Sequence, residues 1–297
     1  MEIYLTEDTK YLTNHGLKYD FEITENDRLA VISPDNELYF TNDFEFITKK
    51  FDSMILQTDE YYKTLLSDAK VNFKYSCDCL PDELPSQITF DLDDKVIDTF
   101  TKDYAIVLSL FVSNYFKETE DNSLVNNGKV DVRLPYRVFS SLNKDFGVYF
   151  KYNTISKCYT IRLPQLFLTS DNQEKLLLFN MNIFKSVVRA AIKTRLVNKR
   201  KFAYMHFNSY KAGQTFLVLL SLCGYRGRLA FDKDRKMFKV TFIKDNQKLD
   251  EGFEPKVEIV NYKSPIETKA IRLATPGKII ISQNINKNTT ISILNIS

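Results

Sequence analysis

The chain has 297 residues, of which 44% are hydrophobic and 27% are charged. These values are ordinary for globular proteins, and they exclude long disordered, collagen-like or fibrous structure. No apolar run approaches the roughly 18 to 20 residues that a transmembrane helix needs. The opening stretch is too acidic for a signal peptide. We therefore expect a soluble, cytoplasmic protein with room for two domains and no membrane contact.

The formal net charge of +3 conceals a strong gradient along the chain. Residues 1–103 hold 10 Lys and Arg against 23 Asp and Glu, whereas residues 185–244 hold 15 against 2. Such a separation favours a polyanion-binding segment beside an acidic segment with another role. The alternative is that the acidic segment, or a partner subunit, occupies the basic one.

Cysteine and histidine are both scarce. Of the four cysteines only Cys77 and Cys79 lie close together, and a C-x-C pair without a second Cys or His pair lacks the spacing of a zinc site. We expect reduced thiols, no metal and no cofactor. With His15 and His206 as the only histidines, a site built on several imidazoles is excluded.

Strands are predicted at both ends of the chain. Short runs rich in β-branched and aromatic residues, separated by turn residues, are typical of a small all-β unit. In chain order the predicted strands cover residues 28–33, 37–41, 53–58, 71–75, 256–262, 268–273 and 278–282.

The middle of the chain follows a helical pattern. Residues 104–117, 174–196 and 210–222 predict helices, and Gly224 is a natural cap for the last of them. Two strands follow, at residues 226–231 and 236–242.

The fold class that follows is α+β. Strand-rich ends around a mixed middle indicate that the ends pair with each other and that the middle is an insertion. We expect residues 1–87 and 251–297 to form one mostly-β domain and residues 88–250 to form an inserted α+β domain.

Several segments, in order along the chain, resemble inteins that carry a LAGLIDADG homing endonuclease. The resemblance implies a Hint-like β domain made by both termini and an inserted LAGLIDADG-like domain. Two segments look like blocks of the Hint domain, namely residues 7–40 and 270–284. Two resemble the LAGLIDADG helices, namely residues 107–115 and 187–196. One more looks like the continuation after the second helix, namely residues 216–242.

The residues that perform splicing in that family are replaced here. The first position, which needs a thiol or hydroxyl nucleophile, aligns with Tyr4. The Thr-x-x-His pair aligns with Ser67 and Lys70, and a protonated lysine cannot shuttle a proton near neutral pH as imidazole does. Asn295 is present at the far end, but Leu294 stands where the helper histidine is expected.

The nuclease positions are also replaced. The two LAGLIDADG acids that would coordinate Mg²⁺ align with Asn114 and Arg195. An amide is a poor ligand for Mg²⁺ and a guanidinium repels it. We therefore expect a pseudoenzyme with no catalytic residues, which neither splices nor cuts DNA; an active nuclease that uses other acids ranks last.

The basic segment is the candidate binding surface. In the LAGLIDADG family a β saddle lies in the DNA major groove, so the resemblance implies binding of double-stranded DNA. Alternation places Arg226 and Arg228 on one face of their strand. On the next strand it places Lys236 and Phe238 on one face and Lys239 on the other. The candidate contact residues are Lys193, Arg195, Lys199, Arg200, Lys201, Arg226, Arg228, Lys233, Arg235, Lys236 and Lys239.

The alternative function belongs to another class. In this reading the inactive domain makes protein–protein contacts as a structural or assembly protein of a virus or phage particle, or of a replication complex. The protein would then reside in the host cytoplasm or in the virion.

Overall fold

The computed structural model describes residues 2–35, 37–58, 73–77, 125–126, 129–134, 151–154, 158–164, 197–199, 202–207, 210–243, 256–285 and 287–296. The predicted helices at residues 104–117 and 174–196 lie outside these ranges. So do seven of the singled-out residues, namely Ser67, Lys70, Asn114, Lys193, Arg195, Arg200 and Lys201.

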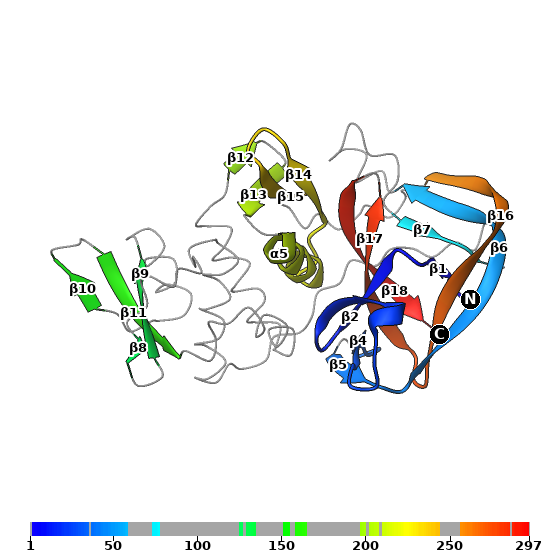
Figure 1. The fold of residues 1–297 in the computed structure, drawn as a ribbon, viewed down its shortest axis with the longest axis horizontal. Helices are drawn as coiled ribbons and strands as arrows, with labels where there is room; N and C mark the ends of the chain where they lie inside the picture. Colours follow the sequence, from blue (N-terminus) through cyan, green and yellow to red (C-terminus); the bar gives the residue numbers. More distant parts are fainter. Residues whose placement is uncertain are drawn as a thin grey trace.

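The described elements are shown in Figure 1. They are β1 (Leu5–Thr6), β2 (Thr9–Thr13), β3 (Gly16–Tyr19), the 3-10 helix η1 (Asp20–Glu22), β4 (Leu29–Ile32), β5 (Leu38–Thr41), β6 (Phe44–Thr58), β7 (Phe73–Tyr75), β8 (Val125–Asn126), β9 (Lys129–Leu134), β10 (Lys151–Asn153), β11 (Cys158–Pro164), β12 (Val197–Lys199), β13 (Phe202–Phe207), α5 (Tyr210–Leu222), β14 (Gly227–Asp232), β15 (Met237–Ile243), β16 (Lys256–Leu273), β17 (Gly277–Ile285) and β18 (Asn288–Ile296).

Most predicted elements in the described ranges are confirmed. Helix α5 has the predicted bounds, and Gly224 follows it with a φ of 78°, the left-handed conformation of a C-cap glycine. The predicted strands at residues 256–262 and 268–273 are instead one long strand, β16. A register shift between Asn261 and Ile266 accommodates Pro265, which cannot donate to the ladder.

The two ends of the chain pair with each other, as predicted. Strand β17 pairs with β2 and β4, while β16 pairs with β1 and along its length with β6. Two sheets result: one has the order β12-β13-β15-β14-β18-β17-β2-β4-β5, with β3 also on β2, and the other has the order β1-β16-β6-β7. A third, separate sheet has the order β10-β11-β9-β8.

The central hairpin belongs to the same sheet as the chain ends. Strand β14 pairs with β18, with Arg228 opposite Thr290 and Ala230 opposite Asn288. One strand of the basic segment, β14, is therefore hydrogen-bonded directly to β18, the last strand. Among the described residues, no helix combines the length and the apolarity that a bilayer crossing requires.

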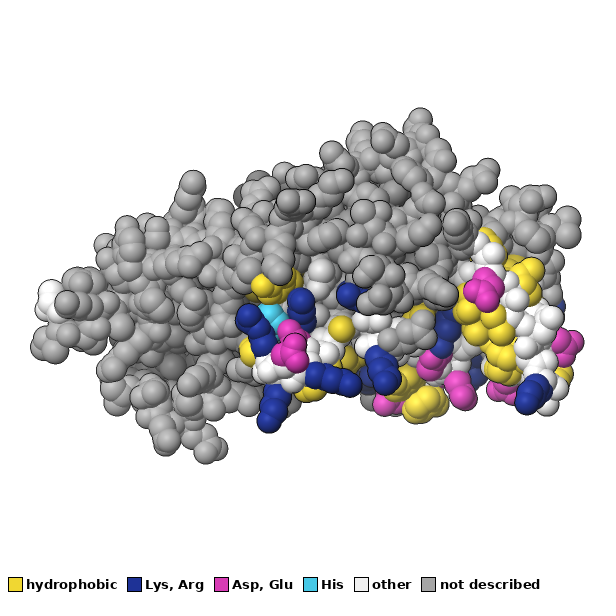
Figure 2. Space-filling view, turned by 90° about the horizontal axis from the view of Figure 1, so that it is seen from above, with side chains coloured by type: hydrophobic (Ala, Val, Ile, Leu, Met, Phe, Trp, Pro, Cys, Tyr) yellow, Lys and Arg dark blue, Asp and Glu magenta, His cyan; other side chains and the backbone are white. Residues whose placement is uncertain are grey.

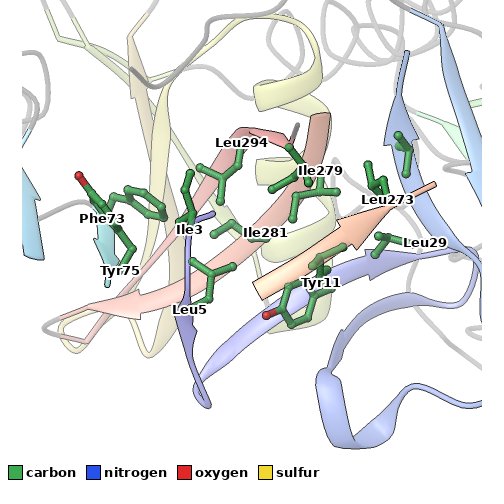
Figure 3. Close-up of a cluster of buried hydrophobic side chains, with 13 residues drawn as sticks. Ile3, Leu5, Tyr11, Leu29, Phe73, Tyr75, Leu273, Ile279, Ile281 and Leu294 are labelled. Carbon is green, nitrogen blue, oxygen red and sulfur yellow. The ribbon is translucent and has the colours of Figure 1, made fainter. Parts of the chain in front are cut away.

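A hydrophobic core lies between the large sheet and the β1-β16-β6-β7 sheet. Alternation along β17 directs Ile279 and Ile281 into this core. In Figure 3 the side chains of Ile3, Ile281 and Leu294 point toward one another, so both chain ends contribute to one core. Ser282, on the opposite face of β17, faces α5, where Gln214 Nε2 lies 3.5 Å from its hydroxyl.

The prediction of reduced thiols is wrong for Cys77, which is disulfide-bonded, while Cys223 is free and buried. A disulfide depends on the distance between two side chains in space, and spacing along the chain does not reveal that distance.

Candidate nucleic-acid interface

Helix α5 covers one face of β13, β14 and β15, which are strands of the basic segment. Its side chain Phe216 is fully buried and packs against Phe207 of β13 and Phe242 of β15, with ring centres 5.4 and 5.9 Å apart. Gly213 approaches Leu229 of β14 so closely that a Cβ atom would lie 2.7 Å from it. Since side chains alternate across a strand, the neighbours of these residues face away from the helix.

The face opposite α5 holds the candidate site, which we name the open face. Strand pairing arranges it in rows: Tyr204, Thr241 and Arg228 lie side by side, as do His206, Lys239 and Ala230 in the next row. The open face consists of Tyr204, His206, Arg228, Ala230, Asp232, Met237, Lys239, Thr241 and Asn288.

A hydrogen-bonded pair of side chains, His206 and Asp232, lies on the open face. His206 Nε2 is 3.0 Å from Asp232 Oδ2, and both side chains are largely shielded from solvent. The hydrogen bond from His206 lowers the pKa of Asp232, helped by the backbone N–H of Arg235 and by the charge of Lys239. These neighbours therefore stabilise the charged form of Asp232, the one carboxylate of the open face.

The two cations of the open face are held by neighbouring side chains. Lys239 Nζ lies 4.6 Å from the centre of the Tyr204 ring, a cation–π contact. Arg228 Nη1 donates a hydrogen bond to Asn288 Oδ1 at 3.3 Å, so a residue of β18 orients it. Figure 2 shows Lys and Arg side chains gathered around a histidine and acidic side chains in the middle of the view.

The turn between β14 and β15 adds further charge at the edge of the open face. Lys233, Asp234, Arg235 and Lys236 are all exposed there. Asp232 accepts backbone hydrogen bonds from Asp234 at 3.2 Å and Arg235 at 3.3 Å, which shapes this turn. The structure thus brings together five of the predicted contact residues, namely Arg228, Lys233, Arg235, Lys236 and Lys239.

Two predicted contact residues are placed differently from expectation. Arg226 precedes β14 and is only 9% exposed, and burial lowers its pKa to about 10, so it does not share a surface with Arg228. Lys236 precedes β15 and has a φ of 52°, so it belongs to the turn and not to the strand face of Phe238. Lys199 ends β12, where only its backbone is described.

Among the nine residues of the open face, sequence reasoning named only Arg228 and Lys239 as contacts. Three of the residues that it missed are Tyr204, His206 and Asn288. The first two lie on β13, whose alternation of buried Met205 and Phe207 with polar neighbours is a readable strand signal. Asn288 reaches the site only through the pairing of β14 with β18, which no local pattern predicts.

Three of the positions that align with the splicing site are described, namely Tyr4, Leu294 and Asn295. Tyr4 is buried, pairs with Ser76 through two backbone hydrogen bonds of 2.8 Å, and donates its hydroxyl to Glu2 at 2.6 Å. Leu294 lies in the core and Asn295 is exposed. Within the described ranges, no group of three or more His, Cys, Asp or Glu is arranged to hold a metal ion.

Comparison with known proteins yields distant structural similarity alone. No protein-family model and no curated protein sequence matches the chain. Among solved structures it is similar to mesophilic variants of the homing endonuclease I-DmoI and to I-DmoI in complex with DNA and Mn, each with 14% identity, a TM-score of 0.32, and coverage of 48% of this chain and 90% of the other. I-DmoI in complex with DNA and Ca has a TM-score of 0.33, with 48% and 84% coverage.

These neighbours are homing endonucleases, the class that the sequence motifs resemble. At such TM-scores the likeness does not establish a shared fold, and it assigns neither an activity nor a ligand. Function is therefore inferred from the open face.

Proposed function

We propose that this protein is a catalytically inactive relative of inteins and homing endonucleases that binds nucleic acid, first of all double-stranded DNA. The binding surface is the open face together with the adjacent turn. The observation that carries the proposal is the placement of Arg228 and Lys239 on one sheet face, each oriented by a neighbouring side chain.

The chemistry of the open face suits a phosphate backbone. Lys and Arg side chains neutralise phosphates and release counterions, which supplies most of the affinity. A two-stranded β-ribbon fits the DNA major groove, as the β14–β15 hairpin would. The carboxylate of Asp232 repels an approaching phosphate less than a carboxylate without hydrogen bonds would, because His206 and two backbone amides of the turn already bind it.

Charge reversal tests the proposal. We expect the double variant Arg228→Glu with Lys239→Glu to lose most duplex affinity in fluorescence anisotropy at low salt. The control is Lys50→Glu with Lys263→Glu, which makes the same charge change at exposed positions of β6 and β16. Equal losses in both double variants would show that net charge alone acts. Absence of duplex binding by the native protein would favour the assembly role.

The inactivity is tested separately. Incubation with supercoiled plasmid and Mg²⁺ is expected to leave the plasmid intact, and fusion between two reporter segments is expected to yield no ligated reporter by intact-mass measurement. A metal-dependent cut or a ligated product would contradict the proposal.

A further inference from the structure

Three aromatic rings form a row on the back of the hairpin, opposite the open face. Phe231 and Phe238 are cross-strand partners with ring centres 5.3 Å apart, and Phe238 meets Tyr210 at 5.5 Å, both edge-to-face. We name Phe231, Phe238 and Tyr210 the aromatic row. Phe231 is 51% exposed although it lies within a strand.

The exposure of Phe231 follows from where α5 begins. Leu229, on the same face of β14, is buried under Gly213 of the helix. Tyr210 is the first residue of α5 and packs on Phe238. The helix therefore covers Leu229 but does not extend over Phe231, which lies closer to the hairpin turn. About half of this large ring therefore remains at the surface, where its apolar area is not buried by the folded chain.

Positive charge surrounds the aromatic row. Lys233, Arg235 and Lys236 are exposed in the turn that follows Phe231, against one acid, Asp234. At about 3.3 Å per strand residue, the backbones of Lys233 and Lys236 lie roughly 7 Å from those of the two phenylalanines. Exposed Lys211 follows Tyr210 on the first turn of α5.

An exposed ring bordered by cations fits one class of ligand better than others. Unpaired bases stack on aromatic side chains while their phosphates pair with Lys and Arg. A duplex keeps its base faces stacked inside, so the ring cannot reach them. An apolar protein partner would leave three cations desolvated at the rim of a small apolar patch.

We propose that the aromatic row binds single-stranded nucleic acid, with a base stacked on Phe231 and phosphates held by the cations of the turn and Lys211. This site shares the cations of the turn with the proposed duplex surface, but its aromatic side chains lie on the opposite face of the hairpin, and so the proposal goes beyond duplex binding. The hairpin would then hold duplex on one side and an unpaired strand on the other.

The test uses a short oligo(dT) labelled for anisotropy and the same oligonucleotide carrying 2-aminopurine. Phe231→Ala is expected to weaken oligo(dT) binding about tenfold, the loss of one stacked base, and to abolish 2-aminopurine quenching. Phe231→Tyr should retain both. Duplex affinity should not change in either variant. Phe21→Ala, which removes a ring that is 73% exposed on η1, is the matched control.

Failure of this inference and failure of duplex binding are distinguishable. If Phe231→Ala binds oligo(dT) as the native protein does, the proposal is overturned whatever the duplex result. If sedimentation shows a dimer that Phe231→Ala dissociates while oligo(dT) binding stays the same, the aromatic row is an interface between two copies. Because Phe231 is half exposed, its truncation is expected to leave the thermal unfolding midpoint nearly unchanged.

Discussion

At the scale of single residues, the carboxylate of Asp27 is held by several hydrogen bonds within the described N-terminal part. Its buried carboxylate accepts hydrogen bonds from Lys18 at 2.6 Å, from the Thr24 backbone at 2.7 Å and from the Thr24 hydroxyl at 2.8 Å, and it lies 2.8 Å from His15 Nδ1. Burial by itself would raise the pKa of Asp27, but these hydrogen bonds outweigh it and hold the pKa well below its usual range.

Acid is therefore expected to destabilise the protein through Asp27. A carboxylate with a lowered pKa contributes stability that is fully present above its unfolded pKa of about 3.9 and is lost as the pH falls further. We expect Asp27→Asn to cost about 2 kcal/mol of unfolding free energy at pH 7 and to flatten the decline below pH 4. Urea unfolding of the native protein and of the Asp27→Asn variant across this pH range measures the unfolding free energy. The same pH dependence in both proteins would contradict the expectation.

At the scale of elements, the start of β17 passes unusually close to β4. A Cβ atom at Gly277 would lie 2.6 Å from Val31 Cγ1 and 3.1 Å from the carbonyl oxygen of Ile32. Valine is stiff at χ1 and a carbonyl belongs to the backbone, so neither yields easily. Gly277→Ala is expected to lower the unfolding free energy by about 1–3 kcal/mol in urea. Thr275→Ala, at an exposed position two residues earlier, should change it little.

The sequence predicts some elements well and others poorly, for physical reasons. Helix α5 is predictable because its apolar run is long and Gly224 ends it. The first half of β6 and all of β18 are missed, because polar residues interrupt their apolar alternation and pairing across the sheet overrides that local pattern. Strand β16 is predicted as two strands because Pro265 suggests a break that a bulge absorbs.

The candidate site is predictable in its charge and not in its geometry. Lys239 and the turn cations follow from the basic composition of residues 185–244. The burial of Arg226 and the contact of Arg228 with Asn288 depend on contacts between distant segments. Such contacts are set by three-dimensional register and leave no local signal.

At the scale of the whole molecule, five acidic side chains of the described N-terminal part pair with cations near the two chain ends. Lys18 pairs with Asp27, Lys74 with Asp8, Lys269 with Asp20, and Arg272 with both Glu2 and Glu45. These pairs join the N-terminal strands to one another and to β16. These five acids therefore do not pair with the cations of the basic hairpin.

The salt dependence of duplex binding tests the central claim most directly. If roughly six to eight phosphates are contacted, the logarithm of the affinity should fall with the logarithm of salt at about −0.9 per contact. Arg228→Ala with Lys239→Ala should reduce this slope by about two, while Lys50→Ala with Lys263→Ala leaves it unchanged. Absence of duplex binding at low salt, or equal slopes in the native and Arg228→Ala, Lys239→Ala proteins, would contradict the open face as the binding surface.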